Sequence, residues 1–316
     1  MPVKDRRALL AACLDGLDGQ DFTDFEVIVV DDGSSDGSAE EAATRAAAGR
    51  PVRVVTTEGI GAVAARSAGV AVAQGDVLAF TDSDCVPSPG WLKAGASAID
   101  AGADVVNGLT QPARPMLPLE RSMGSGLEGL YPTCNIFYRR QAFESAGGFD
   151  QSAATRWGFR PDRRSRGDGF GEDSLLGWRV ARTGVAVHEP DAFVAHAVFP
   201  PDYRELLSRT ARVGAFPALF RELPELRSTT LTRWGWQLGQ RTRLPVYGAA
   251  LATILRRPRL IVVCVAWWAG LRANELRAYP ISWRRRLKVL PVEMLVDVVT
   301  AASLAVGTAA TRSIVL

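Results

Sequence analysis

The chain has 316 residues, of which 47% are hydrophobic and 22% charged, and this composition excludes an intrinsically disordered protein. Its four cysteines show neither pairing nor metal-finger spacing, which excludes a disulfide framework and a zinc ribbon and suits a reducing compartment. The net charge of +3 is unevenly distributed, because residues 201–316 hold 18 Lys and Arg against 7 Asp and Glu, whereas residues 1–200 hold 19 against 27. An acidic body with a basic tail favours an anionic surface as the partner of the tail.

Strands and helices alternate along the first part of the chain. In chain order we expect a helix over 6–18, a strand over 25–30, a helix over 38–48, a strand over 52–55, a loop and helix over 59–73, a strand over 76–80, a helix over 91–101 and a strand over 104–107. Alternation at this pace predicts an α/β protein with a largely parallel sheet and helices on both faces.

The pattern is less regular over the next ninety residues or so. Residues 111–136 are rich in Pro, Gly and Met and show no clear period, so irregular structure is expected there. After them we expect a short helix over 140–146, a turn at 147–150, a cationic loop with arginines at 156, 160, 163, 164 and 166, a helix over 172–183 and short strands over 185–187 and 192–194.

A basic, apolar and helical tail follows residue 200. Two apolar blocks of 12 residues each, 244–255 and 260–271, flank a run of arginines. Neither block reaches the ~20 residues that a membrane-spanning helix needs.

A third apolar block, 287–306, is long enough to span a membrane. However, Glu293, Asp297 and Thr300 recur at i, i+4 and i+7 and form one polar stripe. A carboxylate at the bilayer centre costs about 2.5–3.5 kcal/mol, so the stripe predicts a helix that lies in the membrane interface. The alternative, that these helices form the core of a soluble domain, stays open.

Two carboxylates follow the strand expected over 76–80. Asp82 and Asp84 stand where ligands bind in open α/β sheets, outside the carboxyl ends of strands. Carboxylates there suit a hard divalent cation that also holds a substrate phosphate. Taken alone, the pair fits a helix cap or an Asx turn equally well.

An acidic, glycine-containing loop follows the strand over 25–30. A carboxylate of Asp31 or Asp32 can accept a hydrogen bond from the base edge of a nucleotide, and Gly33 allows close approach. The alternative is simple helix capping by Ser35 or Asp36.

A glycine-rich turn precedes the helix expected before residue 73. Gly59, Gly61 and Ala64 fit the G-x-G-x-x-A dinucleotide fingerprint, but residues 56–58 intervene where that fingerprint needs an immediate turn. A nicotinamide dehydrogenase is therefore disfavoured, and Arg66 is better explained as a phosphate contact.

Glu172 and Asp173 stand at the start of a helix, where the macrodipole favours ionised carboxylates. Beside a metal–phosphate site, an ionised Asp173 would serve as general base for an acceptor hydroxyl. His196 lies between apolar residues and is either a core histidine or a ligand of a metal held elsewhere in the chain.

The order of these motifs resembles the family 2 glycosyltransferases of the GT-A fold, which are inverting enzymes that use nucleotide sugars. The resemblance covers roughly residues 2–200 and rests on Asp31-Asp32-Gly33-Ser34-Ser35-Asp36, Arg66, Asp82-Ser83-Asp84, Thr133-Cys134-Asn135, Gly147-Gly148-Phe149-Asp150 and Gly171-Glu172-Asp173. It implies a GT-A fold with a helical, membrane-associated C-terminal region.

The resemblance also implies residue roles. Asp32 would bind the nucleobase, Arg66 the diphosphate side, and Asp84 with His196 a Mn²⁺ or Mg²⁺ ion, while Asp173 of the Glu172-Asp173 motif would be the catalytic base. The further substrate-binding residues that it implies are Pro2, Val3, Asp5, Asp31, Gly61, Asp82, Ser83, Asn135 and Trp178.

We therefore expect a nucleotide-sugar-binding half over 1–110, an acceptor-binding half over 111–200 and a tail over 201–316. The donor would be a UDP-, GDP- or dTDP-sugar, and the acceptor a lipid-linked sugar or polyprenyl phosphate at the inner face of a bacterial cell membrane. The tail lacks the Gln-x-x-Arg-Trp motif of processive polysaccharide synthases, which disfavours that class, and no nucleic acid partner is expected. A soluble acceptor, or a non-catalytic GT-A-like membrane adaptor, is the alternative.

The start of the chain leads to two further expectations. The short apolar run before Cys13 superficially resembles a lipoprotein signal, but Asp15 follows at once, so an amphipathic first helix is favoured over secretion. Residues 2–5 resemble the end of the family's first strand, whose usual apolar residues are not in the sequence. We expect the natural protein to begin upstream of Met1.

Overall fold

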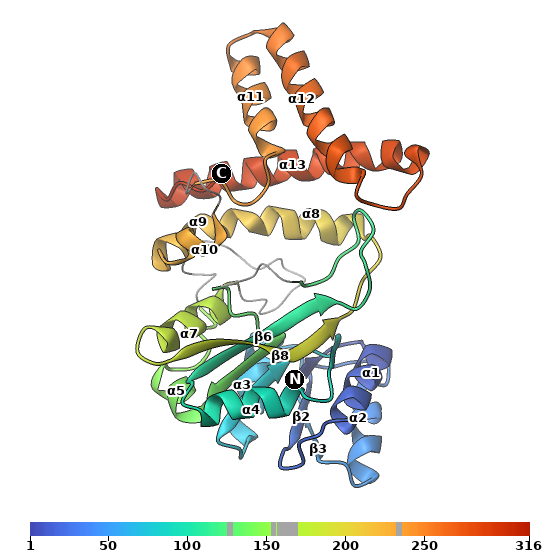
Figure 1. Ribbon diagram of the computed structural model, residues 1–316, viewed down its shortest axis with the longest axis vertical. Coiled ribbons are helices and arrows are strands. Elements are labelled where there is room, and N and C mark those ends of the chain that lie inside the picture. The colour runs from blue at the N-terminus through green and yellow to red at the C-terminus, as the bar shows by residue number, and fades with distance from the viewer. Residues whose placement is uncertain (125–128, 153–155, 157–169, 232–235) are drawn as a thin grey trace. The chain divides into compact units, whose positions relative to one another are not determined.

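The structure is a computed structural model that describes residues 1–124, 129–152, 156, 170–231 and 236–316. The chain divides into two compact units, one formed by residues 1–114 and 122–198, the other by residues 115–121 and 199–316. The first unit contains the sheets with their flanking helices, and the second consists mainly of helices (Figure 1). Four arginines of the expected cationic loop, at positions 160, 163, 164 and 166, lie outside the described residues.

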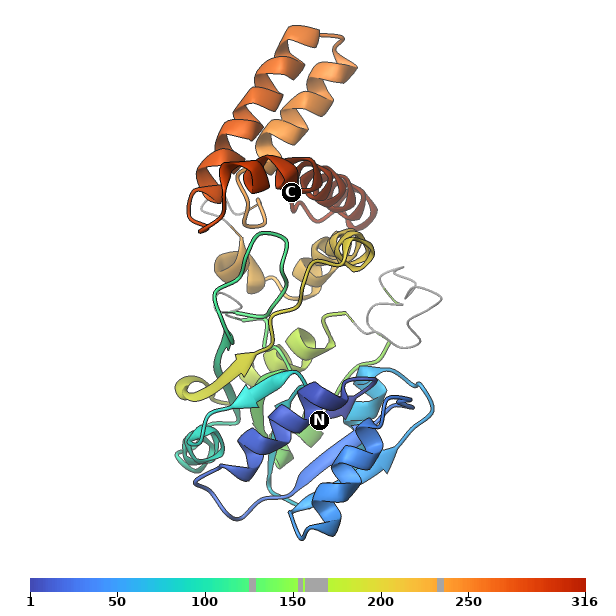
Figure 2. The ribbon, with the colours of Figure 1, turned by 90° about the vertical axis from the view of Figure 1, so that its right-hand side faces the viewer.

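A parallel three-stranded sheet in the order β1-β2-β3 opens the first unit. Its strands are β1 (Pro2–Val3), β2 (Val27–Asp31) and β3 (Val52–Thr56), and its helices are α1 (Arg7–Asp18), α2 (Ser38–Ala47) and α3 (Ala62–Val72). Val27 and Val29 pack into a core with residues of α1 and α2, whereas Val30 lies against Gly69 of α3. Because neighbouring side chains of a strand point to opposite faces, helices cover both faces of this sheet. Figure 2 shows α1 and α2 side by side on one of them.

A mixed five-stranded sheet in the order β4-β7-β6-β8-β5 forms the rest of this unit. Its elements are β4 (Val77–Thr81), β5 (Cys85–Pro87), α4 (Trp91–Asp100), β6 (Val105–Pro112), β7 (Asn135–Arg139), α5 (Arg140–Ser145), α7 (Glu172–Ala181) and β8 (Ala186–His196). The α/β class and the elements expected before residue 110 are confirmed. Three of the six strand pairings among the described residues are antiparallel, so the sheets are more mixed than expected. The sequence did not predict β5 and β7, and each pairs only in antiparallel fashion.

Aromatic side chains hold helices to the two faces of this sheet. On one face Trp91 of α4 packs on Phe137, with ring centroids 4.9 Å apart. On the other face Phe80 of β4 contacts Phe143 and Phe149, with centroids 5.8 and 5.2 Å away. Phe149 belongs to the predicted glycine turn, so that turn is anchored to the core by an aromatic residue.

β8 is one strand where two short strands were expected. It runs parallel to β6, and the register shifts between Gly108 and Leu109. Glycine is needed at 108, because a Cβ there would lie 2.3 Å from the carbonyl oxygen of Ala192. Beyond the shift, the strand continues to His196, which is paired with Cys85 of β5.

The amino group of Met1 lies inside the first unit and donates a hydrogen bond to the carbonyl of Ile28 (2.9 Å). Burial, more than the nearby charge of Arg66, lowers the pKa of this amino group to about 6. A cavity of about 480 Å³ lies beside it, lined by residues that include Ile28 of β2 and 78–80 of β4. The expectation of an upstream start stays a prediction.

The second unit is built around one long helix. Its elements are α8 (Tyr203–Arg212), the 3-10 turn η1 (Val213–Ala215), α9 (Phe216–Glu222), α10 (Leu226–Thr230), α11 (Arg243–Ile254), α12 (Pro258–Leu276) and α13 (Trp283–Thr311). Gly307 of α13 lies so close to Gly214 that a Cβ would be 2.1 Å from the Gly214 carbonyl oxygen. Among the described helices, only α13 is long and apolar enough to cross a membrane, judged by length and composition.

The polar stripe of α13 faces α12, which corrects the interpretation drawn from it. Asp297 is 1% exposed and accepts hydrogen bonds from the indole of Trp268 (2.8 Å) and the guanidinium of Arg272 (2.8 Å). Glu293 lies 3.4 Å from Arg272, and Thr300 is also buried. Because Arg272 and Trp268 satisfy the stripe inside the protein, it gives no support for a helix lying in a membrane interface.

Candidate active site

The start of the chain and the acidic loop after β2 meet where β1 and β2 end, because the carboxyl ends of parallel strands lie at one edge of a sheet. The backbone N–H of Asp32 donates to the carbonyl of Val3, which follows Pro2 in β1 (2.9 Å). Asp5 has a positive φ of 49°, and its carboxylate accepts from the backbone N–H of Ser35 (2.7 Å). The structure therefore brings the residues predicted around Pro2 and those after β2 together.

The carboxylate of Asp32 is enclosed by the turn that follows β3. It accepts hydrogen bonds from the Thr57 hydroxyl (2.6 Å) and from the backbone N–H groups of Ile60 (2.8 Å) and Gly61 (2.9 Å). Burial acts to raise the pKa of Asp32, but these hydrogen bonds outweigh it and lower the pKa. In the neighbouring Asp31, the buried Oδ1 has no hydrogen-bond partner among the described residues. Asp31 thus keeps an unused acceptor, whereas Asp32 shapes the glycine turn.

Arg66 and Asp82 form an ion pair at the end of β4, with Nη2 and Oδ1 2.6 Å apart. Burial acts to raise the pKa of Asp82, but the guanidinium of Arg66 outweighs it and lowers the pKa. Arg66 is 9% exposed, and its Nε has no acceptor within the described part of the chain. Ser83, which follows Asp82, is buried. The guanidinium therefore retains one donor for a further acceptor.

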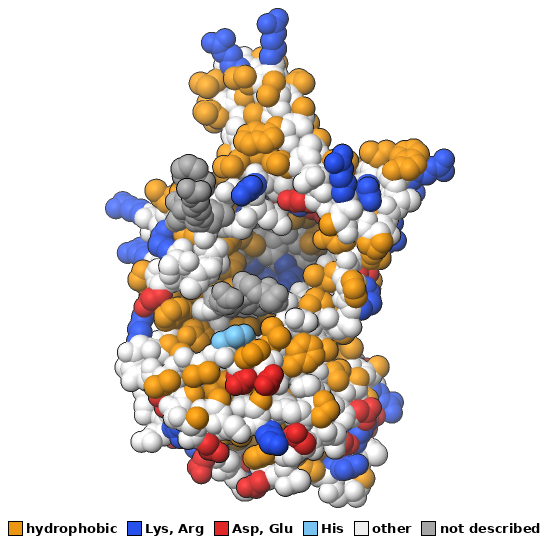
Figure 3. Space-filling view, viewed as in Figure 1, with side chains coloured by type: hydrophobic (Ala, Val, Ile, Leu, Met, Phe, Trp, Pro, Cys, Tyr) orange, Lys and Arg blue, Asp and Glu red, His pale blue; other side chains and the backbone are white. Residues whose placement is uncertain are grey.

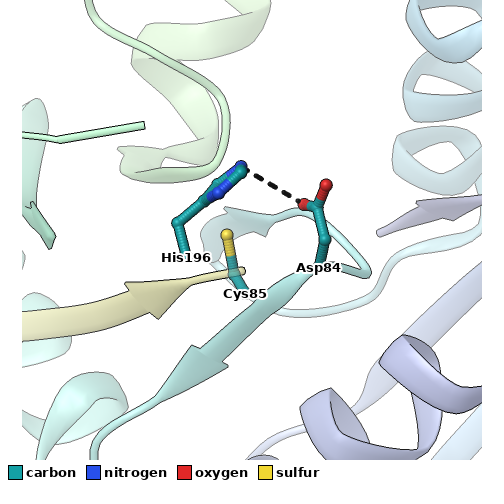
Figure 4. A group of neighbouring side chains, drawn as sticks. All are labelled: Asp84, Cys85 and His196. Carbon is teal, nitrogen blue, oxygen red and sulfur yellow. Dashed lines mark ion pairs between the residues drawn. The ribbon is translucent and has the colours of Figure 1, made fainter. Parts of the chain in front are cut away.

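Asp84, Cys85 and His196 form a compact cluster (Figure 4). Cys85 and His196 are partners in the antiparallel pairing of β5 with β8, so their side chains lie on the same face. One ligand atom from each of the three residues lies within 4.8 Å of the others. Nε2 of His196 lies 3.6 Å from Oδ1 of Asp84, and Nδ1 of His196 lies 3.1 Å from the hydroxyl of Ser122. Asp84 also forms an ion pair with Arg6.

This cluster fits a divalent cation. Oδ1 of Asp84 is buried and accepts no hydrogen bond from the described residues, so a carboxylate oxygen is available to an ion. Carboxylate oxygen suits Mn²⁺ and Mg²⁺, imidazole nitrogen suits several transition metals, and thiolate sulfur suits softer ions such as Zn²⁺. A hydrogen bond with Cys134, and after it burial, raises the pKa of Cys85, so the thiol holds its proton until a cation displaces it.

Glu172 and Asp173 lie in the first turn of α7. The helix position predicted an easily ionised Asp173, and this direction is wrong. Burial, and after it the charge of Glu172, raises the pKa of Asp173 to about 7, although the backbone N–H of Ser174 and the charge of Arg66 oppose the rise. Arg66 interacts electrostatically with both carboxylates, so the acidic pair lies near the Arg66–Asp82 ion pair.

Two residues predicted to bind substrate are engaged inside the protein. Asn135 is 0% exposed; its Oδ1 accepts from the indole of Trp91 (2.8 Å), and its amide donates to backbone carbonyls in β6 and β8 (3.0 and 2.8 Å). Trp178 donates from its indole to the carbonyl of Gly129 (2.8 Å). The amide of Asn135 is therefore buried, and both of its N–H groups donate inside the protein. Its predicted role in substrate binding stays a prediction.

Three residues of the site had no role in the sequence analysis. Cys85 had a local signal, since it follows Asp84 directly, but its spacing from the other cysteines is not that of a metal site. Arg6 is 78 residues from Asp84, and Ser122 is 74 residues from His196. No local pattern connects residues so far apart in the chain.

Comparison with known proteins shows the family of the chain. Residues 1–160 match the model of the family described as glycosyl transferase family 2. The chain is 29% identical over 164 residues to glycosyltransferase AglE of Haloferax volcanii, covering 47% of this chain and 54% of the relative. It is 27% identical over 239 residues to the pre-mycofactocin glycosyltransferase of Mycobacterium tuberculosis, covering 69% of this chain and 46% of the relative. The matches thus span about half the length of these curated relatives.

Solved structures show the same fold at low sequence identity. The mannosyltransferase PcManGT from Pyrobaculum calidifontis, in complex with GDP-Man and Mn²⁺, aligns with a TM-score of 0.54 and 17% identity over 98% of this chain and 85% of its own. TarS residues 1–349 of S. aureus, in complex with UDP-GlcNAc, aligns with a TM-score of 0.51 and 15% identity over 96% of this chain and 89% of its own. The expected GT-A fold is confirmed, and since the family model matches residues 1–160 of 316, the chain belongs to glycosyl transferase family 2.

Proposed function

We propose that the protein is an inverting glycosyltransferase that moves a sugar from a nucleoside-diphosphate sugar to an acceptor hydroxyl. The observation that carries this proposal is the position of Asp173. This carboxylate has a pKa raised to about 7 and interacts electrostatically with Arg66, which forms an ion pair with Asp82. A general base works best when its pKa is close to the operating pH.

The donor would bind along the edge where the parallel strands end. The residues proposed for its nucleoside are Pro2, Val3, Asp5, Asp31, Asp32 and Gly61, and those proposed for its diphosphate and sugar are Arg66, Asp82, Ser83 and Trp178. The unused acceptor of Asp31 and the unused Nε donor of Arg66 support this division. GDP-Man in PcManGT and UDP-GlcNAc in TarS support a nucleotide sugar as donor, with UDP, GDP and dTDP as candidates.

Asp84 and His196 would hold the divalent cation, Mn²⁺ or Mg²⁺, with Cys85 beside them. When bound, this ion would offset the negative charge that develops on the leaving nucleoside diphosphate. The Mn²⁺ in the PcManGT structure supports the use of a divalent metal in the family.

Asp173 would perform the proton transfer. Its carboxylate takes the proton of the acceptor hydroxyl while the hydroxyl oxygen bonds to the anomeric carbon from the face opposite the leaving group. The bond from that carbon to the diphosphate oxygen breaks with its electron pair, so the anomeric configuration is inverted. Glu172 would keep the pKa of Asp173 high through its negative charge.

We further propose three functional parts: residues 1–110 for the donor, 111–200 for acceptor and catalysis, and 201–316 as a membrane-associated tail. The basic, apolar composition of the tail supports a lipid-linked or membrane-proximal acceptor and a location at the inner face of the cell membrane. A soluble small molecule or peptide is the second candidate acceptor, because the Arg272 network shows that part of the tail is a folded core.

The test compares the parent with Asp173→Asn. We expect unchanged donor binding by calorimetry and a loss of transfer of about 10²–10⁴-fold. A non-catalytic adaptor would neither bind nor turn over any nucleotide sugar, with or without Mn²⁺. Transfer at the parental rate by Asp173→Asn would show that another residue is the base.

A further inference from the structure

Helices α11 and α12 form a hairpin within the second unit whose outer part exposes large apolar side chains. α11 and α12 run alongside each other in Figure 1, joined at residues 255–257. Ile254 is 76% exposed, Val262 69% and Val263 61%. Figure 3 shows apolar side chains over this hairpin with basic side chains at its far end. Large apolar side chains gathered on one exposed element often mark a surface that binds a partner or a membrane.

The exposed residues of α12 do not form one stripe. Leu260, Val262, Val263, Val265 and Trp267 are all exposed, and at 100° per residue they point in several directions around the helix. A helix that is apolar all round is normally buried in protein or in lipid. Among the described residues, α11 covers one side of α12 near Cys264, and the five apolar residues named above stay exposed.

The charge of the hairpin indicates what covers it. Glu275, near the end of α12, is the hairpin's one acidic residue and pairs with Arg272. The outer part of the hairpin, residues 244–271, contains three arginines and no aspartate or glutamate. These arginines, Arg256, Arg257 and Arg259, stand at or next to the connection between the two helices. Apolar side chains next to cations, without any anion, complement an anionic lipid surface, where tails meet phosphate groups.

The dimensions favour a position in the interface. α11 has 12 residues and is therefore about 18 Å long at 1.5 Å per residue, whereas the hydrocarbon core of a bilayer is about 30 Å thick. If the hairpin entered the bilayer with its α11–α12 connection leading, the arginines at 256, 257 and 259 would lie within the hydrocarbon, where charged groups are costly. Arginines that reach the lipid phosphates while the apolar residues enter the tails avoid that cost.

We propose that the α11–α12 hairpin is a membrane-docking element that lies in the headgroup region of an anionic bilayer. This proposal rests on the function proposed above, because the bilayer that the hairpin binds would be the membrane that holds the acceptor. Vesicle binding requires neither donor nor catalysis, and the two proposals can therefore fail separately. The element also differs from α13, whose polar stripe is satisfied inside the protein.

The experiment uses the full chain and vesicles of phosphatidylcholine with or without 30 mol% phosphatidylglycerol (about a third anionic lipid, a strongly negative surface). The parent should co-sediment with the anionic vesicles. An apolar variant, Ile254→Ser with Val262→Ser and Val263→Ser, should lose at least about tenfold in partitioning, since each change removes an apolar side chain that would enter the lipid. A charge variant, Arg256→Gln with Arg257→Gln and Arg259→Gln, should lose about 10²-fold on the anionic vesicles only.

The matched control is Val306→Ser, which removes an equally exposed valine (69%) from α13. It should bind vesicles like the parent. All substituted apolar side chains are exposed, so unchanged thermal unfolding midpoints are expected and are measured alongside. Parental binding by the apolar variant, or weaker binding by Val306→Ser alone, overturns the proposal. A third outcome also overturns it. If the parent sediments as a dimer without lipid, and the apolar variant is a monomer that binds vesicles like the parent, then a second copy of the chain covers the hairpin.

Discussion

Cys85 and His196 are direct partners across β5 and β8, and with Asp84 they offer three ligand atoms within 4.8 Å of one another. A cation at this place would meet sulfur as well as nitrogen and oxygen. Sulfur favours softer ions, so the choice between Mn²⁺ and Zn²⁺ depends on whether the thiol takes part.

We predict that Cys85→Ser lowers the affinity for Zn²⁺ or Co²⁺ by more than about 10–100-fold and the affinity for Mn²⁺ by less. Losing a residue that only hydrogen-bonds to a metal ligand typically costs about 10–100-fold, and losing a ligand itself should cost more. Co²⁺ bound to the parent should show a thiolate-to-metal absorption band that Cys85→Ser lacks. Cys13→Ser, which also changes a buried thiol, is the control and should keep the band. A Co²⁺ spectrum without that band in the parent would remove Cys85 from the ligand set.

Arg6 and Asp84 form an ion pair in the same cluster. A cation that binds Asp84 has to compete with this guanidinium, because both need the same carboxylate. We predict that Arg6→Gln raises the affinity for Mn²⁺ several-fold, measured by calorimetry without nucleotide. The neighbouring Arg7 is an exposed arginine that pairs with Glu41, so Arg7→Gln should leave the affinity unchanged. Weaker Mn²⁺ binding in Arg6→Gln would mean that Arg6 positions Asp84 and does not compete for it.

The raised pKa of Asp173 leads to a pH dependence of transfer. Only the ionised carboxylate accepts a proton, so kcat/KM should rise with pH and level off above an apparent pKa of about 7. Glu172→Gln removes a negative neighbour and should move this rise to lower pH. If kcat/KM rises at the same pH in the parent and in Glu172→Gln, the rise does not report the ionisation of Asp173.

The same shift predicts how stability depends on pH. The folded form binds the proton of Asp173 more tightly than the unfolded form between the ordinary aspartate pKa of 3.8 and about 7. Stability from this group is therefore fully present below pH 3.8 and is lost as pH rises through 7. In Asp173→Asn, this fall in unfolding free energy should be missing when denaturant midpoints are compared across that range.

Asp297 is the central acceptor of the buried network in the second unit. Its loss leaves the guanidinium of Arg272 without its main buried partner, and breaking such a pair costs about 3–5 kcal/mol. We predict a loss of this size in the unfolding free energy of Asp297→Ala. Glu275 also contacts Arg272 (2.7 Å) but is 45% exposed, so Glu275→Gln should cost no more than about 1 kcal/mol. Equal losses in the two variants would contradict a buried role for Asp297.

Much of the fold and of the candidate site followed from the sequence alone. The apolar run before Asp31 and the Ala- and Glu-rich run after Ser38 predicted β2 and α2 within two residues of their ends. Local signals suffice there, because periodicity and turn residues act over a few positions. Asp32 follows β2 and Asp82 follows β4, as the sequence predicted, and the catalytic use of these strand ends stays a prediction.

Tertiary structure alone decided strand register, burial and the direction of polar faces, because these depend on contacts between residues far apart in the chain. The pairing of Cys85 with His196 depends on the register of two strands that are far apart in the chain. The pKa of Asp173 depends on burial and on the charge of Glu172, which together outweigh the hydrogen bond from the Ser174 backbone N–H and the charge of Arg66. The stripe around Asp297 was visible in the sequence, but its direction was not, because only packing against Arg272 determines whether a polar face meets protein, lipid or water.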